Sequence, residues 1–320
     1  MTESMAISNI LGPTPVDRFL ADYWQRQPLL VRGALPNFNP PLDGHDLAAL
    51  SLQEEVESRL VQTVLSDKED KDDHIKLSHG PFSDATFANL PERDWTLLVQ
   101  AVDLWTPEFN PLLEHFSFLP PWRLDDIMAS FAVPGGSVGP HFDQYDVFLL
   151  QVTGERHWRI GQRCDENSTL SASSDLSTLS DFDEQSAWTL GPGDMLYVPP
   201  GVAHWGVAET ECLTFSIGFR SPTLFELMDD LAVEIGSLPA NPVLTDPPLT
   251  QAMASTKIDP AFVCQVQAML TTLIKDEQLL GTWLAKYMTR PKYADLTSLT
   301  GELRTAEFGG KRFVNGELQD

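Results

Sequence analysis

The chain has 320 residues, 42% of them hydrophobic, so it is long enough to bury the core of one large domain or of about two or three modest ones. Lysine and arginine together number 21, against 46 aspartate and glutamate residues, which gives a net charge of −25. So acidic a surface repels phosphate backbones and attracts basic proteins. This argues against direct nucleic-acid binding, although solubility or a saline habitat would explain the charge equally well.

The first part of the chain carries short apolar patterns of two kinds. Apolar side chains at helical spacing, with Asp17 in position to cap the first group, predict helices, and runs rich in Leu, Val and Ile predict strands. The charged run 66–73 between two of these strands is typical of a solvated hairpin tip. Helices are expected at 16–24, 42–50, 94–105 and 110–116, and strands at 27–32, 56–65 and 75–77.

The most informative stretch is a Gly/Pro-rich turn followed by an aromatic and apolar run, residues 134–160. His141 and Asp143 lie two positions apart, so on a strand their side chains point to the same face. An imidazole and a carboxylate then converge, one ligand short of the two-His, one-carboxylate site of non-haem Fe(II) oxygenases. His204, which follows a short apolar strand and a Pro/Gly turn, is the expected third ligand. A lone His here would more often be a packed residue, so the joint pattern carries the prediction.

The remaining patterns predict further strands and then a change to helices. Two apolar runs flank Gly154 and read as a hairpin, and residues 167–185, rich in Ser, Thr and Asp, read as a loop near the mouth of the site. A core strand at 213–220 precedes Pro222, where the strand-rich part is expected to end. The hairpin strands are expected at 146–152 and 155–160, and helices at 224–235, 262–273 and 279–289, with a Pro-rich segment at 239–248.

Two motifs resemble those of the cupins: Gly135-x5-His141-x-Asp143 and Gly193-x5-Pro199-x-Gly201-x2-His204. Asp143 stands where many cupins have a second His, and no Glu follows in the usual window, which points to the oxygenase branch. With Gly154-x-Arg156-x-Trp158-Arg159, the pattern is similar to the JmjC-type ribosomal oxygenases. Within that family it is most similar to the bacterial arginine hydroxylases of large-subunit ribosomal protein sixteen. The resemblance is clear over residues 17–235 and looser beyond.

The resemblance implies a mainly β fold with helices. It implies a double-stranded β-helix, the cupin or JmjC jelly roll, as the catalytic domain over residues 1–223. A helical dimerisation region is expected over 224–295, and with it a homodimer. The family continues into an acidic winged-helix-like module, and residues 296–320 are expected to hold only a truncated start of it. Apolar helix faces alone would equally suit a C-terminal bundle packed on its own barrel.

The resemblance also implies the cofactors and their ligands. Fe(II) is expected on His141, Asp143 and His204, with 2-oxoglutarate as cosubstrate and O2 as oxidant. Arg156 is expected on the return strand of the hairpin, where its guanidinium would hold the distal carboxylate of 2-oxoglutarate. A solvated strand arginine is the other reading, but Trp158 on the same face suggests a sheltered side. Candidates for supporting hydrogen bonds are Ser130, Thr214 and Ser216.

The implied activity is hydroxylation of an arginine side chain in a ribosomal protein, a basic partner that suits the acidic charge. The same chemistry on a histidine or asparagine of another protein, histone demethylation, a non-oxygenase metal-binding cupin and an inactive scaffold stay open as alternatives. Three scattered cysteines without a CxxC pair indicate neither a disulfide framework nor a cysteine zinc site. Neither a membrane span nor a signal peptide is expected, so we expect the protein in the cytoplasm.

Overall fold

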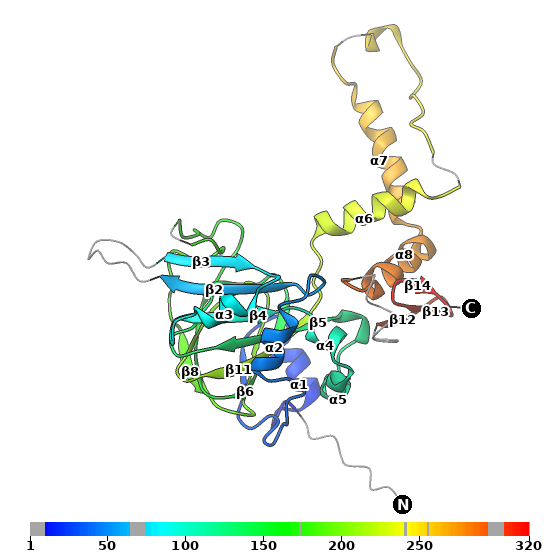
Figure 1. The fold of residues 1–320 in the computed structure, drawn as a ribbon. Coiled ribbons are helices and arrows are strands. Elements are labelled where there is room, and N and C mark those ends of the chain that lie inside the picture. Colours follow the sequence, from blue (N-terminus) through cyan, green and yellow to red (C-terminus); the bar gives the residue numbers. More distant parts are fainter. Residues whose placement is uncertain are drawn as a thin grey trace, which may run out of the picture. The chain divides into compact units, whose positions relative to one another are not determined.

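A computed structural model describes residues 10–64, 74–172, 174–239, 242–254, 256–293 and 304–319. These residues form two compact units, one up to Ser221 and one from Pro222 onward (Figure 1). The predicted hairpin tip at 66–73 lies outside the described residues. No helix in the described ranges combines the length and the hydropathy that a membrane crossing needs.

Two antiparallel sheets form the first unit, which is mainly β as predicted. In the described part of the chain the larger sheet has eight strands: β1 (Leu29–Val31), β2 (Ser58–Val64), β3 (His74–His79), β4 (Trp95–Val99), β5 (Leu124–Ala132), β6 (Asp146–Thr153), β9 (Met195–Val198) and β11 (Cys212–Phe219). Their order across the sheet is β1-β9-β6-β11-β5-β4-β2-β3. The smaller sheet has the order β10-β7-β8 and consists of β7 (Arg156–Arg163), β8 (Ser186–Leu190) and β10 (Val202–Ala208).

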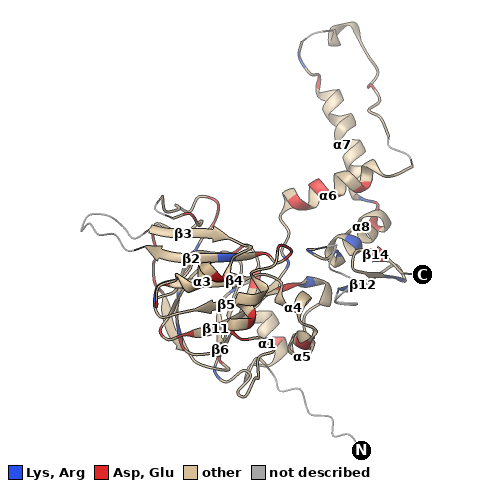
Figure 2. Cartoon of the chain, viewed as in Figure 1, with Lys and Arg blue, Asp and Glu red and all other residues tan. Residues whose placement is uncertain are grey.

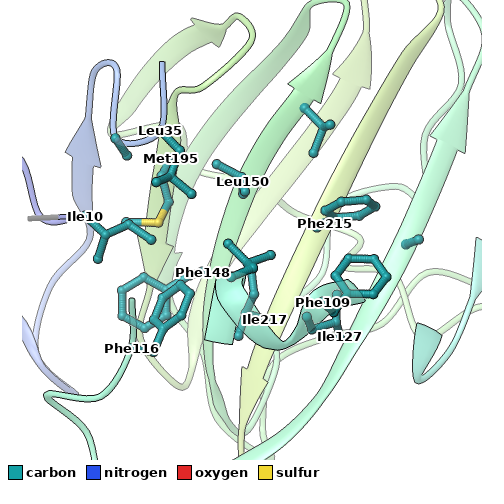
Figure 3. Close-up of a cluster of buried hydrophobic side chains, with 14 of the residues drawn as sticks. Ile10, Leu35, Phe109, Phe116, Ile127, Phe148, Leu150, Met195, Phe215 and Ile217 are labelled. Atoms are coloured by element: carbon teal, nitrogen blue, oxygen red, sulfur yellow. The ribbon is translucent and has the colours of Figure 1, made fainter. Parts of the chain in front are cut away.

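Alternation along the strands divides the larger sheet into a core face and an inner face. In β11, Phe215 and Ile217 pack with Phe148 of β6 in the main hydrophobic core (Figure 3). Thr214 and Ser216, which alternate with them along the strand, point the opposite way and line a cavity. Successive side chains of a strand point to opposite faces of the sheet. A sequence in which apolar and small polar residues alternate therefore supplies both the core face and the inner face.

Short helices cover the core face of the larger sheet. Phe19, Leu47, Val102 and Leu112 from these helices are buried in the same cluster as the strand residues. The elements are α1 (Val16–Arg18), the π turn η1 (Phe19–Tyr23), α2 (Gly44–Leu50), α3 (Asp84–Ala88), α4 (Val102–Trp105), η2 (Pro107–Phe109), α5 (Asn110–Glu114) and η3 (Pro121–Arg123). The core therefore lies between these helices and the sheet, and leaves the inner face for the cavity.

The predicted helix at 94–105 is wrong. Residues Trp95–Val99 form β4 inside the larger sheet, and the helix α4 begins only at Val102. Four of the five β4 residues are buried, so both faces of the strand are covered. The sequence therefore lacks the alternation of a half-exposed strand. Ala101, in the left-handed region at φ 54°, separates the strand from the helix.

The predicted hairpin around Gly154 is also wrong, although both of its strands exist. β6 pairs with β9 and β11, whereas β7 pairs with β8 and β10, so the turn carries the chain from one sheet to the other. Gly154 has φ +63°, and a Cβ there would lie 2.0 Å from the backbone oxygen of Glu211. The glycine is needed for a sharp crossing between sheets.

The second unit contains the three predicted C-terminal helices and a small sheet. Among the described residues these are α6 (Leu224–Gly236), α7 (Pro260–Ile274), α8 (Glu277–Thr289), the short η4 (Gln251–Met253), and the strands β12 (Thr305–Phe308), β13 (Lys311–Val314) and β14 (Glu317–Leu318). Trp283 of α8 donates a hydrogen bond to Asp230 of α6 at 2.8 Å, and Lys286 pairs with Glu234 at 2.8 Å. These contacts fix α8 against α6.

A buried carboxylate at the start of β6 joins several parts of the first unit. Asp146 is fully buried and accepts hydrogen bonds from Tyr197 (2.6 Å), Gln25 (3.0 Å) and Arg123 (3.2 Å). Tyr197 lies in β9, Gln25 follows η1, and Arg123 precedes β5. Asp146 therefore fixes the strand that directly follows the predicted metal-ligand pair.

We expect Asp146→Ala to lower the free energy of unfolding by about 3 kcal/mol, because it leaves the buried Tyr197 hydroxyl without its acceptor and removes the ion pair of the partly buried Arg123. Urea denaturation followed by tryptophan fluorescence measures the change. The control is Asp22→Ala, which removes the exposed Arg18–Asp22 ion pair and should cost less than about 0.5 kcal/mol. Equal losses in the two variants would contradict the structural role of Asp146.

Candidate metal centre

His141 and Asp143 lie in an extended segment before β6 rather than in a regular strand. The backbone N–H of His141 donates to the carbonyl of His204 at 3.0 Å, and that of His204 donates to the carbonyl of His141 at 2.8 Å. Gly201 donates to the carbonyl of Asp143 at 2.7 Å. The segment therefore runs antiparallel to β10, so the backbone itself brings the predicted third ligand opposite the first two.

The three predicted ligands meet at one point. One ligand atom from each of His141, Asp143 and His204 lies within 4.8 Å of the other two. The Nε2 atom of His204 is 3.6 Å from a carboxylate oxygen of Asp143, and the two imidazole ring centroids are 4.2 Å apart. Two imidazoles and one carboxylate at this spacing suit a divalent transition metal with open coordination positions.

Backbone carbonyls orient both imidazoles. The Nδ1 atom of His141 lies 3.0 Å from the carbonyl of Gly139, and that of His204 lies 3.1 Å from the carbonyl of Val202. A carbonyl only accepts, so each Nδ1 donates and each Nε2 keeps a free lone pair toward the shared point. Burial, and to a lesser extent the neighbouring His141, lower the pKa of His204 to about 4, so this imidazole is neutral at physiological pH. A neutral imidazole is the form that binds a metal.

Arg156 is a buried cation beside this cluster, with only 2% of its surface exposed. It donates through one terminal nitrogen to Ser130 Oγ at 3.0 Å and through the other to the carbonyl of Gly206 at 3.3 Å. Its guanidinium carbon lies 5.0 Å from the ring centre of Trp158. Burial lowers the pKa of Arg156, but a guanidinium stays protonated in proteins. Arg156 is therefore sheltered from solvent, as the position of Trp158 in the sequence predicted. Its strand, β7, belongs to the smaller sheet and not to a hairpin with β6.

The cluster and the arginine open into one cavity of about 320 Å³ between the two sheets. The larger sheet contributes side chains of its inner face, and the smaller sheet contributes Arg156, Trp158 and His204. The cavity therefore joins a metal-ligand set to a cation that has no carboxylate partner among the described residues, and a ligand with two anionic ends can bridge them. All seven residues predicted for the site line it: Ser130, His141, Asp143, Arg156, His204, Thr214 and Ser216.

Sequence reasoning missed several residues of the cavity wall. Met128 lies on the inner face of β5, two residues before Ser130. Because residues two apart on a strand share a face, this spacing could have identified Met128. Tyr145 follows the motif but carried no separate signal. Leu176 and Thr178 come from the loop that was expected near the mouth, and the N–H of Leu179 donates to the carbonyl of Pro140 at 2.7 Å. The loop is therefore attached beside the metal-ligand segment.

Comparisons with known proteins agree with this geometry. A profile of the JmjC domain matches residues 111–227. A probable ribosomal oxygenase of Haemophilus influenzae is 42% identical over 67% of this chain, a match that spans about half, 52%, of that protein's length. The ribosomal protein uL16 3-hydroxylase of Escherichia coli is 35% identical over 86% of this chain and 71% of its own.

A solved structure supports the same relationship. The ribosomal oxygenase YcfD of Escherichia coli, in complex with cobalt and 2-oxoglutarate, superposes with a TM-score of 0.79 at 31% identity, over 96% of this chain and 86% of that one. The predicted mainly β fold of the cupin or JmjC type is thereby confirmed, as is the resemblance on which it was based. The chain belongs to the JmjC-domain ribosomal oxygenases.

Proposed function

We propose that this protein is an Fe(II)- and 2-oxoglutarate-dependent hydroxylase that acts on an arginine side chain of a large-subunit ribosomal protein. The observation that carries the proposal is the convergence of His141, Asp143, His204 and the buried Arg156 on one cavity. A metal site without a nearby cation would suit many cupins. The pairing with a guanidinium suits a chelating acid that has a second carboxylate.

In this proposal His141, Asp143 and His204 hold the metal. Their side chains fit it, because both Nε2 atoms are free and the carboxylate of Asp143 lies 3.6 Å from one of them. Three protein ligands leave exchangeable positions for a 2-oxo acid and for O2. When bound, the metal and 2-oxoglutarate supply the oxidising chemistry for C–H hydroxylation, with succinate and carbon dioxide as co-products.

Arg156 binds the distal carboxylate of 2-oxoglutarate. Ser130 Oγ already accepts a hydrogen bond from Arg156, so its own hydrogen is available for the same carboxylate. Thr214 donates its hydroxyl hydrogen to the side chain of the buried Gln151 at 3.0 Å, which leaves its oxygen toward the cavity. Ser216 lines the same wall of the cavity. We assign Ser130, Thr214 and Ser216 supporting roles around the cosubstrate.

The electrostatics of the cavity mouth support a cationic target. Burial raises the pKa of Tyr145 well above its usual range, and the negative charges of Asp143, Asp126 and Asp125 raise it further. Burial disfavours any charge, but the three carboxylates, which disfavour a phenolate, favour a guanidinium at the same place. The acidic surface, with Asp and Glu on both units, would also attract a basic ribosomal protein (Figure 2). The relative from Escherichia coli named a uL16 3-hydroxylase supports the same target.

The most direct test combines Fe(II), 2-oxoglutarate and a peptide of large-subunit ribosomal protein sixteen. We expect succinate formation and a mass gain of one oxygen on an arginine. His204→Ala should reduce turnover by more than about 100-fold, because even partners outside the ligand shell contribute about 10- to 100-fold. Mass spectrometry and a succinate assay measure both effects.

The control is His157→Ala, which removes an imidazole that faces Thr189 at 3.1 Å outside the metal cluster. It should retain wild-type turnover. Oxygen gained only on a histidine-containing peptide would favour the related histidine hydroxylases, and loss of a methyl group would favour demethylation. Turnover that survives in His204→Ala would refute the ligand assignment.

Arg156→Ala should raise the KM for 2-oxoglutarate by about 30-fold or more, because the distal carboxylate loses its charged partner. The affinity for the metal should stay unchanged. Steady-state kinetics with varied 2-oxoglutarate measure the change. The control is Arg159→Ala on the same strand, where the guanidinium stacks on Trp205 at 4.5 Å and pairs with Glu184 at 3.6 Å. An unaltered KM in Arg156→Ala would contradict the assignment.

We propose further that the protein is a homodimer joined through the helical unit, and that β12–β14 begin a winged-helix-like module. An exposed apolar stripe along one face of α7 supports a second copy as the partner. A chain with this net charge repels other acidic proteins, so burial of apolar surface must supply the attraction between copies. The stripe is Val263, Val266, Leu270 and Ile274, which are 42–58% exposed.

Val266→Glu combined with Leu270→Glu should convert the dimer to a monomer, because it places two charges in the apolar interface. Light scattering coupled to gel filtration measures the mass. The control, Thr272→Glu, adds a charge on the opposite, exposed face of α7 and should leave the dimer intact. A wild-type chain that is monomeric at micromolar concentration would contradict the proposal.

We also propose that the protein acts in the cytoplasm. Ribosomal proteins are made there, and Fe(II) is available. The three cysteines of the described residues are unpaired, which agrees with a reducing compartment.

A further inference from the structure

We propose that Gly206 is a positioning residue for Arg156, and that its missing side chain makes the cavity select a 2-oxo acid with a second carboxylate. Gly206 lies in β10, two residues after His204, and pairs with Trp158 of β7. The inference rests on the proposed function, because it concerns how the guanidinium is placed to receive the distal carboxylate.

The first argument is space. A Cβ on Gly206 would lie 2.7 Å from Nε of Arg156 and 2.8 Å from two ring carbons of Trp158. Contacts this short do not occur between real side chains, so one neighbour would have to move. The backbone of Gly206 is not in the left-handed region, so its conformation does not require glycine. The requirement comes from the two side chains that cross over it.

The second argument is that neither neighbour can move without loss. Trp158 is 4% exposed and packs with Ile160 and Leu196 in the core between the sheets. A terminal nitrogen of Arg156 is held by its hydrogen bond to Ser130. The Nε atom of Arg156, which faces Gly206, is buried and has no hydrogen-bond partner among the described residues. A methyl group at position 206 therefore pushes the guanidinium out of the place where it meets Ser130.

The third argument is that the carbonyl of Gly206 is itself fixed. It accepts from Arg156 at 3.3 Å and from Ser137 Oγ at 2.8 Å. Ser137 Oγ in turn accepts from the N–H of Gly139 at 3.0 Å, and the carbonyl of Gly139 orients His141. One hydrogen-bonded chain thus links the guanidinium to a metal ligand, so the strand cannot retreat to relieve the overlap.

The consequence is a specific change in ligand preference. A 2-oxo acid without a distal carboxylate, such as 2-oxobutanoate, meets only the metal, and its affinity does not depend on Arg156. 2-Oxoglutarate contacts both the metal and Arg156. Displacement of the guanidinium should therefore weaken 2-oxoglutarate and leave 2-oxobutanoate unchanged.

The experiment is calorimetric binding of both acids to the Mn(II)-loaded protein, which needs no turnover. In Gly206→Ala we expect the Kd of 2-oxoglutarate to rise by about tenfold, as is usual for an overpacked buried site. The Kd values of 2-oxobutanoate and Mn(II) should stay within about twofold of the wild-type values. Gly218→Ala is the matched control, because a Cβ there meets its nearest atom, the carbonyl oxygen of Asp126, at an ordinary 3.7 Å. It should bind both acids like the wild type.

A double-mutant cycle with Arg156→Ala completes the test. Once the guanidinium is removed, Trp158 has room to shift. Adding Gly206→Ala to Arg156→Ala should therefore not raise the Kd of 2-oxoglutarate any further. If Gly206→Ala alone does not fold but the double variant does, the overlap with Arg156 is also demonstrated. Equal weakening of both acids, an unchanged Kd, or an additive cycle would overturn the inference. A wild-type protein that does not prefer 2-oxoglutarate to 2-oxobutanoate would instead refute the proposed function.

Discussion

A buried positive charge without an anionic partner is the constraint on which the site depends. Arg156 donates only to a hydroxyl and a carbonyl, and within the described residues no carboxylate forms an ion pair with it. Burial of a cation in this way costs several kcal/mol, and a fold keeps such a residue when a ligand completes it. The cavity places that charge opposite a cluster of two imidazoles and one carboxylate. The two features together define a ligand that chelates a metal at one end and carries an anion at the other.

The two sheets make this arrangement possible because each strand has two faces with separate tasks. Phe215 and Ile217 of β11 stabilise the core under the helices, while the alternating residues Thr214 and Ser216 face the cavity. The smaller sheet then supplies the charged and metal-binding side chains from the other side. Stability and chemistry can therefore change independently along one strand.

The site could be predicted from the sequence better than the fold around it. The motif spacing identifies four site residues even where the strands between them are predicted wrongly. The structure brings all four, His141, Asp143, Arg156 and His204, to one cavity. The strand pairing could not be predicted in the same way. A turn at Gly154 shows that the chain reverses, but not that it enters another sheet, because pairing depends on residues far away in sequence.

Burial explains the other errors and omissions. The run at 95–99 is mostly apolar and is buried on both faces, so its pattern does not separate a buried strand from a helix. Gly206 gave no signal, because its importance comes from Arg156 and Trp158 crossing over it, and only coordinates show that contact.

Crystallography of the complex with Fe(II) and 2-oxoglutarate, prepared without oxygen, tests the central claim most directly. Anomalous scattering at the iron edge should give one strong peak bounded by Nε2 of His141, the carboxylate of Asp143 and Nε2 of His204. The far carboxylate of the bound acid should lie within hydrogen-bond distance of the Arg156 guanidinium. An iron peak elsewhere, or an acid whose second carboxylate points away from Arg156, would contradict the account.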